Sequence, residues 1–128
     1  KAFINKIKLN SEYLFVIGFS NGGYMTDKLS WMSANNKWIN IIASSPMAGF
    51  IYDNNKYIES NKKIQIPILF HHSFNDHLVN INGCCKNIQC CCGITYKKCH
   101  SLQNEFQEWL QWNGCDTYND LEKHFINN

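Results

Sequence analysis

The sequence has no arginine, only two prolines and few charged residues of either sign. Lysine supplies all 12 basic side chains, charged residues make up 17% of the chain, and the net charge is +2. Such a weak charge argues against a protein that binds nucleic acid or an anionic membrane surface. No apolar run reaches the ~18 residues that a membrane-spanning helix needs. The sequence also lacks an Asn-x-Ser/Thr acceptor for N-glycosylation.

Aliphatic and aromatic residues, by contrast, are plentiful. Hydrophobic residues account for 45% and aromatic residues for 14% of the 128 positions, which excludes a disordered tail and allows one real core. The chain begins at Lys1 and shows no signal peptide. We therefore expect a piece excised from a longer protein.

Short apolar runs alternate with helical periodicity along the chain. We expect strands at residues 13–17, 38–43 and 64–70, and helices at residues 24–32 and 101–112. Turns should follow at residues 18–23 and 44–49, and Pro67 should mark the start of the third strand or a bulge. The unbroken apolar run at 13–17 predicts a strand buried on both faces. This order predicts an α/β fold whose parallel strands are joined by right-handed crossovers.

The last expected helix carries signals at both of its ends. Ser101 is a favourable N-cap, and apolar residues follow it at helical spacing. Gly114 is well placed to end the helix. The polar residues 50–63 are most simply a surface loop between two strands.

The segment Gly18-Phe19-Ser20-Asn21-Gly22 matches G-x-S-x-G and lies between an expected strand and an expected helix. A nucleophilic serine needs this context, a sharp strand-to-helix turn with small residues two before and two after it. The helix N-terminus behind the serine favours negative charge, and the backbone N–H of Asn21 becomes one oxyanion-hole donor. We predict Ser20 as the nucleophile; the alternative is a Gly/Ser turn in an inert α/β domain.

A serine nucleophile needs a base, and the base needs an orienting carboxylate. In an α/β-hydrolase the acid follows the serine in the chain. Of the downstream acids, only Asp76 lies in a loop that leaves the carboxyl end of an expected buried strand, where sites in parallel sheets assemble. We predict Asp76 as this acid; the alternative is a loop aspartate that makes a local turn hydrogen bond.

No histidine of the chain fits the place of the base. The five histidines are His71, His72, His77, His100 and His124. The first two precede the predicted acid and lie at a strand end, while the third adjoins it and cannot face its carboxylate properly. The fourth starts the last expected helix, and the fifth has no strand before it. We therefore expect the base to lie beyond Asn128.

Four blocks of sequence follow one another in a characteristic order. Residues 18–25 read GFSNGGYM, residues 46–49 read PMAG, residues 67–80 read PILFHHSFNDHLVN, and residues 109–115 read WLQWNGC. These blocks resemble the secreted esterase family of polyhydroxybutyrate depolymerases and feruloyl esterases. That family shows a G-x-S-N-G-G-x-M elbow, a P-x-A-G turn, a P-x-L-x-x-H-G-x-x-D-x-x-V-P segment and a W-x-x-x-N-G-C helix ending.

The resemblance implies a partial α/β-hydrolase fold, with three parallel strands, flanking helices and a Cys-rich loop. Residues 1–128 would be the central part of a single catalytic domain, truncated at both ends. The matching positions imply that Ser20 is the nucleophile, Asn21 the oxyanion donor and Asp76 the triad acid. His72 matches a family histidine that is not the base. The segments that carry the base and the second oxyanion donor in the family are absent here.

The acid loop departs from the family pattern at two positions. Ser73 replaces a glycine and Asn80 replaces a proline, so the geometry of this loop is open. The implied activity is hydrolysis of carboxylic esters, either polyhydroxyalkanoates or feruloyl and other acyl esters, through an acyl-enzyme. The resemblance implies no metal and no organic cofactor, and the substrate is the expected partner, with no nucleic acid and no membrane.

Cysteine is concentrated in one short stretch. Six of the seven cysteines fall within residues 84–99, and the full set is Cys84, Cys85, Cys90, Cys91, Cys92, Cys99 and Cys115. Such density favours disulfides and an oxidising compartment, so we expect a secreted, extracellular protein. Zinc binding and free thiols are the alternatives, although the spacing is not the paired C-x-x-C of a zinc ribbon. An odd number leaves at least one cysteine without a partner in this chain.

Two other functions stay open on the sequence. An oligopeptidase-type serine peptidase also uses a G-x-S-x-G-G elbow. A non-catalytic, hydrolase-like binding module is compatible with the altered acid loop. Asn21, the turn at residues 46–49 and the Cys-rich loop favour the esterase.

Overall fold

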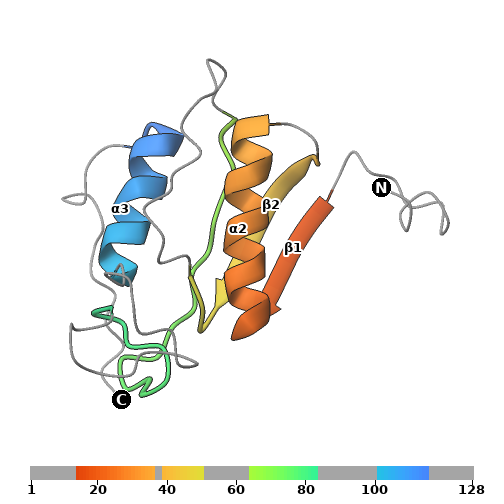
Figure 1. Cartoon of the computed structure of the whole chain (residues 1–128). Coiled ribbons are helices and arrows are strands. Elements are labelled where there is room, and N and C mark those ends of the chain that lie inside the picture. Colours follow the sequence, from red (N-terminus) through yellow and green to blue (C-terminus); the bar gives the residue numbers. More distant parts are fainter. Residues whose placement is uncertain (1–13, 37–38, 51–63, 84–100, 116–128) are drawn as a thin grey trace, which may run out of the picture.

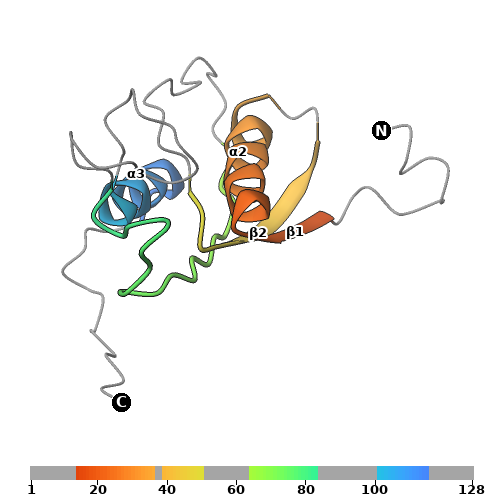
Figure 2. The same cartoon turned by 60° about the horizontal axis from the view of Figure 1, so that its bottom comes forward.

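The computed structural model describes residues 14–36, 39–50, 64–83 and 101–115. In chain order these ranges contain β1 (Leu14–Phe19), α2 (Asn21–Asn36), β2 (Ile41–Met47) and α3 (Leu102–Asn113). The two strands are parallel, and both helices lie on the same side of them (Figures 1 and 2), so the described chain is a small α/β arrangement. No helix in these ranges is long and apolar enough to cross a membrane.

The pairing of β1 with β2 confirms the strand–helix–strand order expected from the sequence. Its register places Val16 opposite Ser44 and Phe19 opposite Met47. β2 therefore runs through residues that were expected to form a turn at 44–49, and that expectation is wrong for 44–47. Backbone pairing on both edges of β2, rather than apolar side chains, keeps these residues extended.

The strand expected at residues 64–70 is present only as an extended segment beside β2. It makes two isolated parallel bridges, Ser44 to Ile68 and Met47 to His71. The bonds to β2 begin at the carbonyl of Pro67, which accepts from the N–H of Ser44 at 3.0 Å. Proline has no N–H to donate, so Pro67 marks the start of pairing, as expected for proline in a sheet.

A second proline, Pro46 of β2, explains why the two bridges do not merge into a continuous strand. Between the bridged pairs, a parallel ladder needs an N–H at residue 46 to donate to the carbonyl of Leu69, and proline lacks it. The hydroxyl of Ser45 donates to that carbonyl instead, at 3.0 Å. The expected third strand is thus wrong as a continuous element, although its position and direction are right.

Helix α2 is longer than the expected helix at residues 24–32. Its buried side chains include a row of small polar residues, Thr26, Asp27, Ser30 and Ser33. Ser33 Oγ donates to the carbonyl of Ile39 at 2.6 Å and accepts from the N–H of Ile41 at 3.1 Å, which ties α2 to the start of β2. Hydrophobic periodicity underestimates this helix because part of its buried face is polar.

Helix α3 confirms the expected boundaries. Ser101 is the N-cap, and its side chain accepts from the N–H of Asn104 at 3.1 Å. Gly114 ends the helix in the left-handed conformation, with φ 68°. The cap signals in the sequence were therefore sufficient to place both ends.

The end of α3 also closes one edge of the extended segment. The side-chain amide of Asn113 donates to the carbonyl of Ile66 at 2.9 Å and accepts from its N–H at 3.0 Å. Trp112 Nε1 donates to the carbonyl of Ile64 at 2.9 Å. At this point α3 takes the place of a neighbouring strand, which gives the asparagine of the N-G-C ending a structural role.

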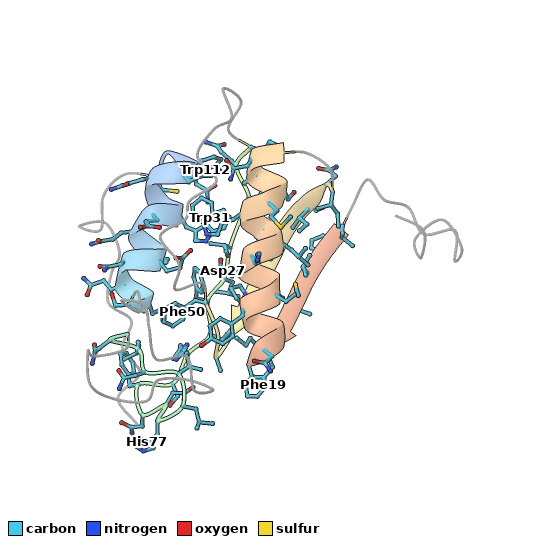
Figure 3. All side chains as sticks on the ribbon, in the orientation of Figure 1. Phe19, Asp27, Trp31, Phe50, His77 and Trp112 are labelled. Atoms are coloured by element: carbon cyan, nitrogen blue, oxygen red, sulfur yellow. The ribbon has the colours of Figure 1, made fainter. Side chains whose placement is uncertain are left out.

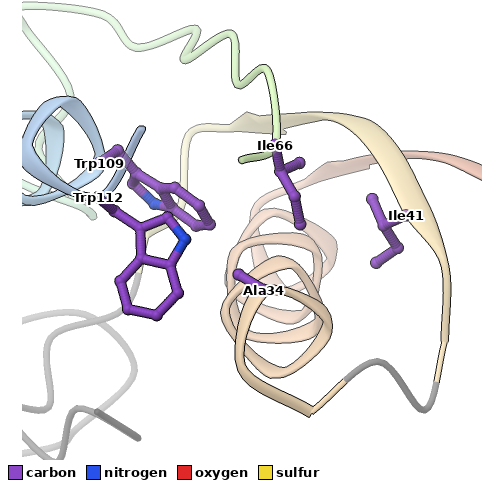
Figure 4. Close-up of a cluster of buried hydrophobic side chains, with 5 residues drawn as sticks. All are labelled: Ala34, Ile41, Ile66, Trp109 and Trp112. Carbon is purple, nitrogen blue, oxygen red and sulfur yellow. The ribbon is translucent and has the colours of Figure 1, made fainter. Parts of the chain in front are cut away.

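The core lies between α2, α3 and the strands. Its buried apolar members are Ala34, Ile41, Ile66, Trp109 and Trp112 (Figure 4). Trp31 of α2 stacks on Trp109 of α3, with ring centroids 3.9 Å apart. Trp31 Nε1 donates to Glu105 Oε1 at 2.7 Å, and Trp109 Nε1 donates to Asp27 Oδ1 at 3.0 Å. A tryptophan of each helix thus donates a hydrogen bond to a buried carboxylate of the other helix. Figure 3 shows Asp27 and Trp31 between the two helices.

No described helix or strand covers the opposite face of the sheet. Phe15, Ile17 and Phe19 of β1 are 69%, 68% and 69% exposed, and Leu69 of the extended segment is 60% exposed. The expectation that β1 is buried on both faces is therefore wrong. Both described helices lie on the other side of the strands, where alternate residues of β1 contact the core.

Candidate active site

The predicted elbow has the backbone that such a turn requires. Ser20 lies between β1 and α2 and has φ 54°. Ser20 and Ala48 are the two non-glycine residues with positive φ in the described ranges. A left-handed conformation is uncommon outside glycine and marks local strain, which is a frequent property of functional turns. Ser20 therefore occupies a strained strand-to-helix turn, as the motif predicts.

Hydrogen bonds hold this turn from two sides. The N–H of Ser20 donates to the carbonyl of Met47 at 2.9 Å, and the carbonyl of Ser20 accepts from the N–H of Tyr24 at 3.1 Å. The second bond opens α2, so the N–H groups of residues 21–23 have no acceptor within the helix. The N–H of Asn21, the predicted oxyanion donor, therefore stands at the helix N-terminus directly after Ser20.

The first glycine of the motif is required by close packing. A Cβ on Gly18 would overlap the carbonyl of Gly22 and come within 2.6 Å of Thr26 Oγ1. The first turn of α2 therefore rests directly on the end of β1. This contact explains why the motif needs a glycine two residues before the serine.

Asp76, the predicted acid, lies in a tight loop after the extended segment. Its Oδ1 accepts from the N–H groups of Leu78 at 2.9 Å and Val79 at 2.8 Å. Oδ1 therefore makes the local turn hydrogen bonds that were given as the alternative role of Asp76. Its Oδ2 lies 3.7 Å from His72 Nε2, and the side chain is 17% exposed. One carboxylate oxygen builds the loop, and neither of the two loop hydrogen bonds reaches the other oxygen.

The surroundings of Asp76 favour its charged form. The hydrogen bond from the N–H of Val79 is the largest cause that lowers the pKa of this carboxyl below its ordinary value of 3.8. Partial burial opposes that effect, while the N–H of Leu78 and the nearby His72 and His77 reinforce it. Asp76 is therefore an anion at neutral pH, as a carboxylate that orients an imidazole must be.

His72 is a structural residue of this loop. Its Nε2 lies 2.7 Å from the carbonyl of Val79, so Nε2 must carry a proton and donate it. The side chain is 2% exposed, and its ring meets that of Phe50 edge to face. This bond commits Nε2 to the loop, and that His72 is not the base stays a prediction.

The two departures from the family pattern build turns in the acid loop. Ser73 Oγ accepts from the N–H of Asn75 at 3.2 Å, and Asn80 Oδ1 accepts from the N–H of Asn82 at 2.9 Å. Ser73 has no positive φ, so a glycine is not required at this position. The loop therefore accommodates both residues.

The elbow and the acid loop lie at the same edge of the sheet. The carbonyl of Met47 accepts from the N–H of Ser20, and the N–H of Ala48 donates to the carbonyl of His71 at 2.8 Å. The carboxyl ends of β1, β2 and the extended segment therefore lie side by side. Figure 3 shows Phe19, next to the elbow, and His77, in the acid loop, at the same end of the molecule. No hydrogen bond joins Ser20 to Asp76 or to a histidine within the described ranges. A triad places a base between these two groups.

Most of the predicted cysteine site lies outside the described residues. Cys115 follows α3 with an exposed thiol, and no disulfide joins it to another described residue. The other six candidates, Cys84 to Cys99, are in a segment that the structure does not describe. Among described residues, no group of His, Cys, Asp or Glu has the geometry of a metal site.

Sequence reasoning missed Ala48, which turns the chain beside the elbow, and two residues that hold the extended segment, Ser45 and Asn113. Asn113 had a signal, because it belongs to the N-G-C block. Ser45 acts only because Pro46 beside it removes a donor. Ala48 carries no signal in its residue type, since alanine does not favour positive φ.

Comparison of the chain with protein-family models, with curated proteins and with solved structures found no match.

Proposed function

We propose that this chain carries the nucleophile and the acid of a serine esterase with an α/β-hydrolase fold, related to polyhydroxybutyrate depolymerases and feruloyl esterases. The observation that carries the proposal is the backbone of Ser20, whose φ of 54° at a strand-to-helix junction supports a nucleophile elbow. The family is proposed from the sequence blocks that resemble it, one of which contains this residue. The protein is proposed to be secreted, with disulfides in its Cys-rich segment.

In the proposed reaction, Ser20 Oγ attacks the ester carbonyl while a histidine beyond Asn128 takes its proton. The N–H of Asn21 donates to the oxyanion that forms. Asp76 Oδ2 accepts from the other ring nitrogen of that histidine and holds it in the required tautomer. The alcohol leaves, and water then hydrolyses the acyl-enzyme. Each of the three residues has its supporting geometry, namely the strained turn, the open helix terminus and the ionised carboxylate.

The test is ester hydrolysis by the full-length protein. We expect turnover of p-nitrophenyl esters, and we expect Ser20→Ala to lower kcat at least about 10⁴-fold. The matched control is Ser45→Ala, which removes a hydroxyl whose bond lies within the sheet and should keep most of the activity. A preference for peptide anilides would instead support the peptidase, and no turnover of either substrate would support a binding module.

A further inference from the structure

The turn that follows β2 contacts both parts of the proposed site. We call residues 47–49 the β2 corner: Met47, Ala48 and Gly49. Ala48 at its apex has φ 48°, so its backbone is left-handed like that of Ser20. An alanine keeps such a conformation only where its surroundings over-determine it. The proposed reaction assigns no role to this corner.

On one side the β2 corner holds the elbow. The carbonyl of Met47 accepts from the N–H of Ser20 at 2.9 Å. Gly49 lies against the backbone of the elbow, because a Cβ there would overlap the carbonyl of Ser20 and come within 2.9 Å of the N–H nitrogen of Tyr24. Any displacement of the corner therefore displaces Ser20.

On the other side the β2 corner holds the start of the acid loop. The N–H of Ala48 donates to the carbonyl of His71 at 2.8 Å, and the N–H of His71 donates to the carbonyl of Pro46 at 3.1 Å. After its bond to His71, the left-handed Ala48 turns the chain out of the sheet and brings Gly49 onto the elbow. The β2 corner thus connects the elbow at Ser20 with the segment that leads to Asp76.

We propose that Ala48 is a positioning residue, which sets the placement of Ser20 relative to the acid loop through its left-handed backbone. The link to catalysis rests on the proposed esterase function. A displacement of the nucleophile by about 1 Å costs roughly a hundredfold in rate. The placement itself is a property of the backbone and is measured without any substrate.

The experiment compares Ala48→Asn with Ala48→Thr in the full-length protein. The two new side chains are polar and similar in size, but asparagine adopts positive φ readily, whereas β-branched threonine does not. Amide hydrogen exchange of Ser20 and of residue 48 reports the backbone. The rate at which a fluorophosphonate labels Ser20, together with kcat and KM for a p-nitrophenyl ester, reports the chemistry.

We expect Ala48→Thr to speed exchange of the Ser20 amide at least about tenfold and to slow labelling about a hundredfold, with KM little changed. Ala48→Asn should stay within about twofold of the wild type in each measurement. If Ala48→Thr fails to fold, Ala48→Leu replaces it with the same expected direction, because a bulky side chain also disfavours positive φ. Equal exchange in the Asn and Thr variants would overturn the proposal. A wild-type protein that fluorophosphonate does not label would instead refute the esterase function, while exchange would still decide the role of Ala48.

Discussion

The side chains of β1 alternate between two faces of the sheet, and only one of these faces packs against the helices. Toward the helices, Leu14 and Val16 of β1 pack against the buried core. On the opposite side, Phe15, Ile17 and Phe19 remain more than two-thirds exposed. Because side chains alternate along a strand, a continuous apolar run prepares both faces for burial, but a covering layer decides which face is buried. Stability in the described chain should therefore reside on the helix face.

The helix face owes its order to polar contacts as well as to apolar area. Asp27 and Glu105 are buried, and each accepts from a tryptophan of the facing helix. A buried acceptor that loses its donor carries an uncompensated desolvation cost. Substitutions on this face should therefore cost more than the loss of apolar area alone, whereas substitutions on the open face should cost little.

The largest effect that we expect is from Trp109→Ala. Trp109 is 1% exposed, stacks on Trp31 and donates to Asp27. Its removal leaves a cavity and takes one hydrogen-bond donor from the buried carboxylate of Asp27, so the free energy of unfolding should fall by about 4 kcal/mol. Urea unfolding followed by circular dichroism measures this change.

Phe15→Ala on the open face is the matched aromatic truncation. Phe15 is 69% exposed, so its free energy of unfolding should change by less than about 1 kcal/mol. Similar losses in Trp109→Ala and Phe15→Ala would contradict the contrast between the faces. They would mean that the face carrying Phe15 is covered in the folded protein.

A smaller effect is expected at the edge that α3 closes. Asn113 makes two side-chain hydrogen bonds to the backbone of Ile66, so Asn113→Ala should lower the free energy of unfolding by about 2 kcal/mol. Asn113→Asp keeps the acceptor but turns the donor into an oxygen that faces the carbonyl of Ile66, and at pH 7 it should be no better than alanine. An Asp variant as stable as the wild type would show that the bond to this carbonyl does not matter.

The sequence predicted the parts of the fold that depend on local signals. The ends of α3 followed from Ser101 and Gly114, and the parallel strands followed from their apolar runs. The extended segment was misjudged because its regularity depends on Pro46, a residue of the neighbouring strand. The exposed face of β1 was missed because a continuous apolar run does not show which covering layer exists.

The candidate site divides in the same way. The strain at Ser20 and the loop position of Asp76 were predicted, because a motif and a strand end define them locally. The role of Ala48 was not predicted, since it depends on contacts with other parts of the chain, made by Ala48 with His71 and by Gly49 with Ser20. Residues shaped by their neighbours leave no pattern in a single sequence.

The smallest effect concerns the acid loop, which lies at the same edge of the sheet as the elbow. The pKa of Asp76 is lowered in the folded protein, so its ionised form contributes stability above the ordinary value of 3.8. That contribution should be lost as the pH falls through the lowered folded value. Asp76→Asn should therefore be less stable than the wild type at pH 7, by less than the Asn113→Ala loss, and this difference should shrink below about pH 4.

Urea unfolding of the wild type and Asp76→Asn from pH 7 to pH 3 measures this difference. A difference that stays constant down to pH 3 would mean that Asp76 is held by its turn rather than by its charge. Asp76 would then resemble the other polar residues that shape this edge, and its role as the triad acid would lose its electrostatic support.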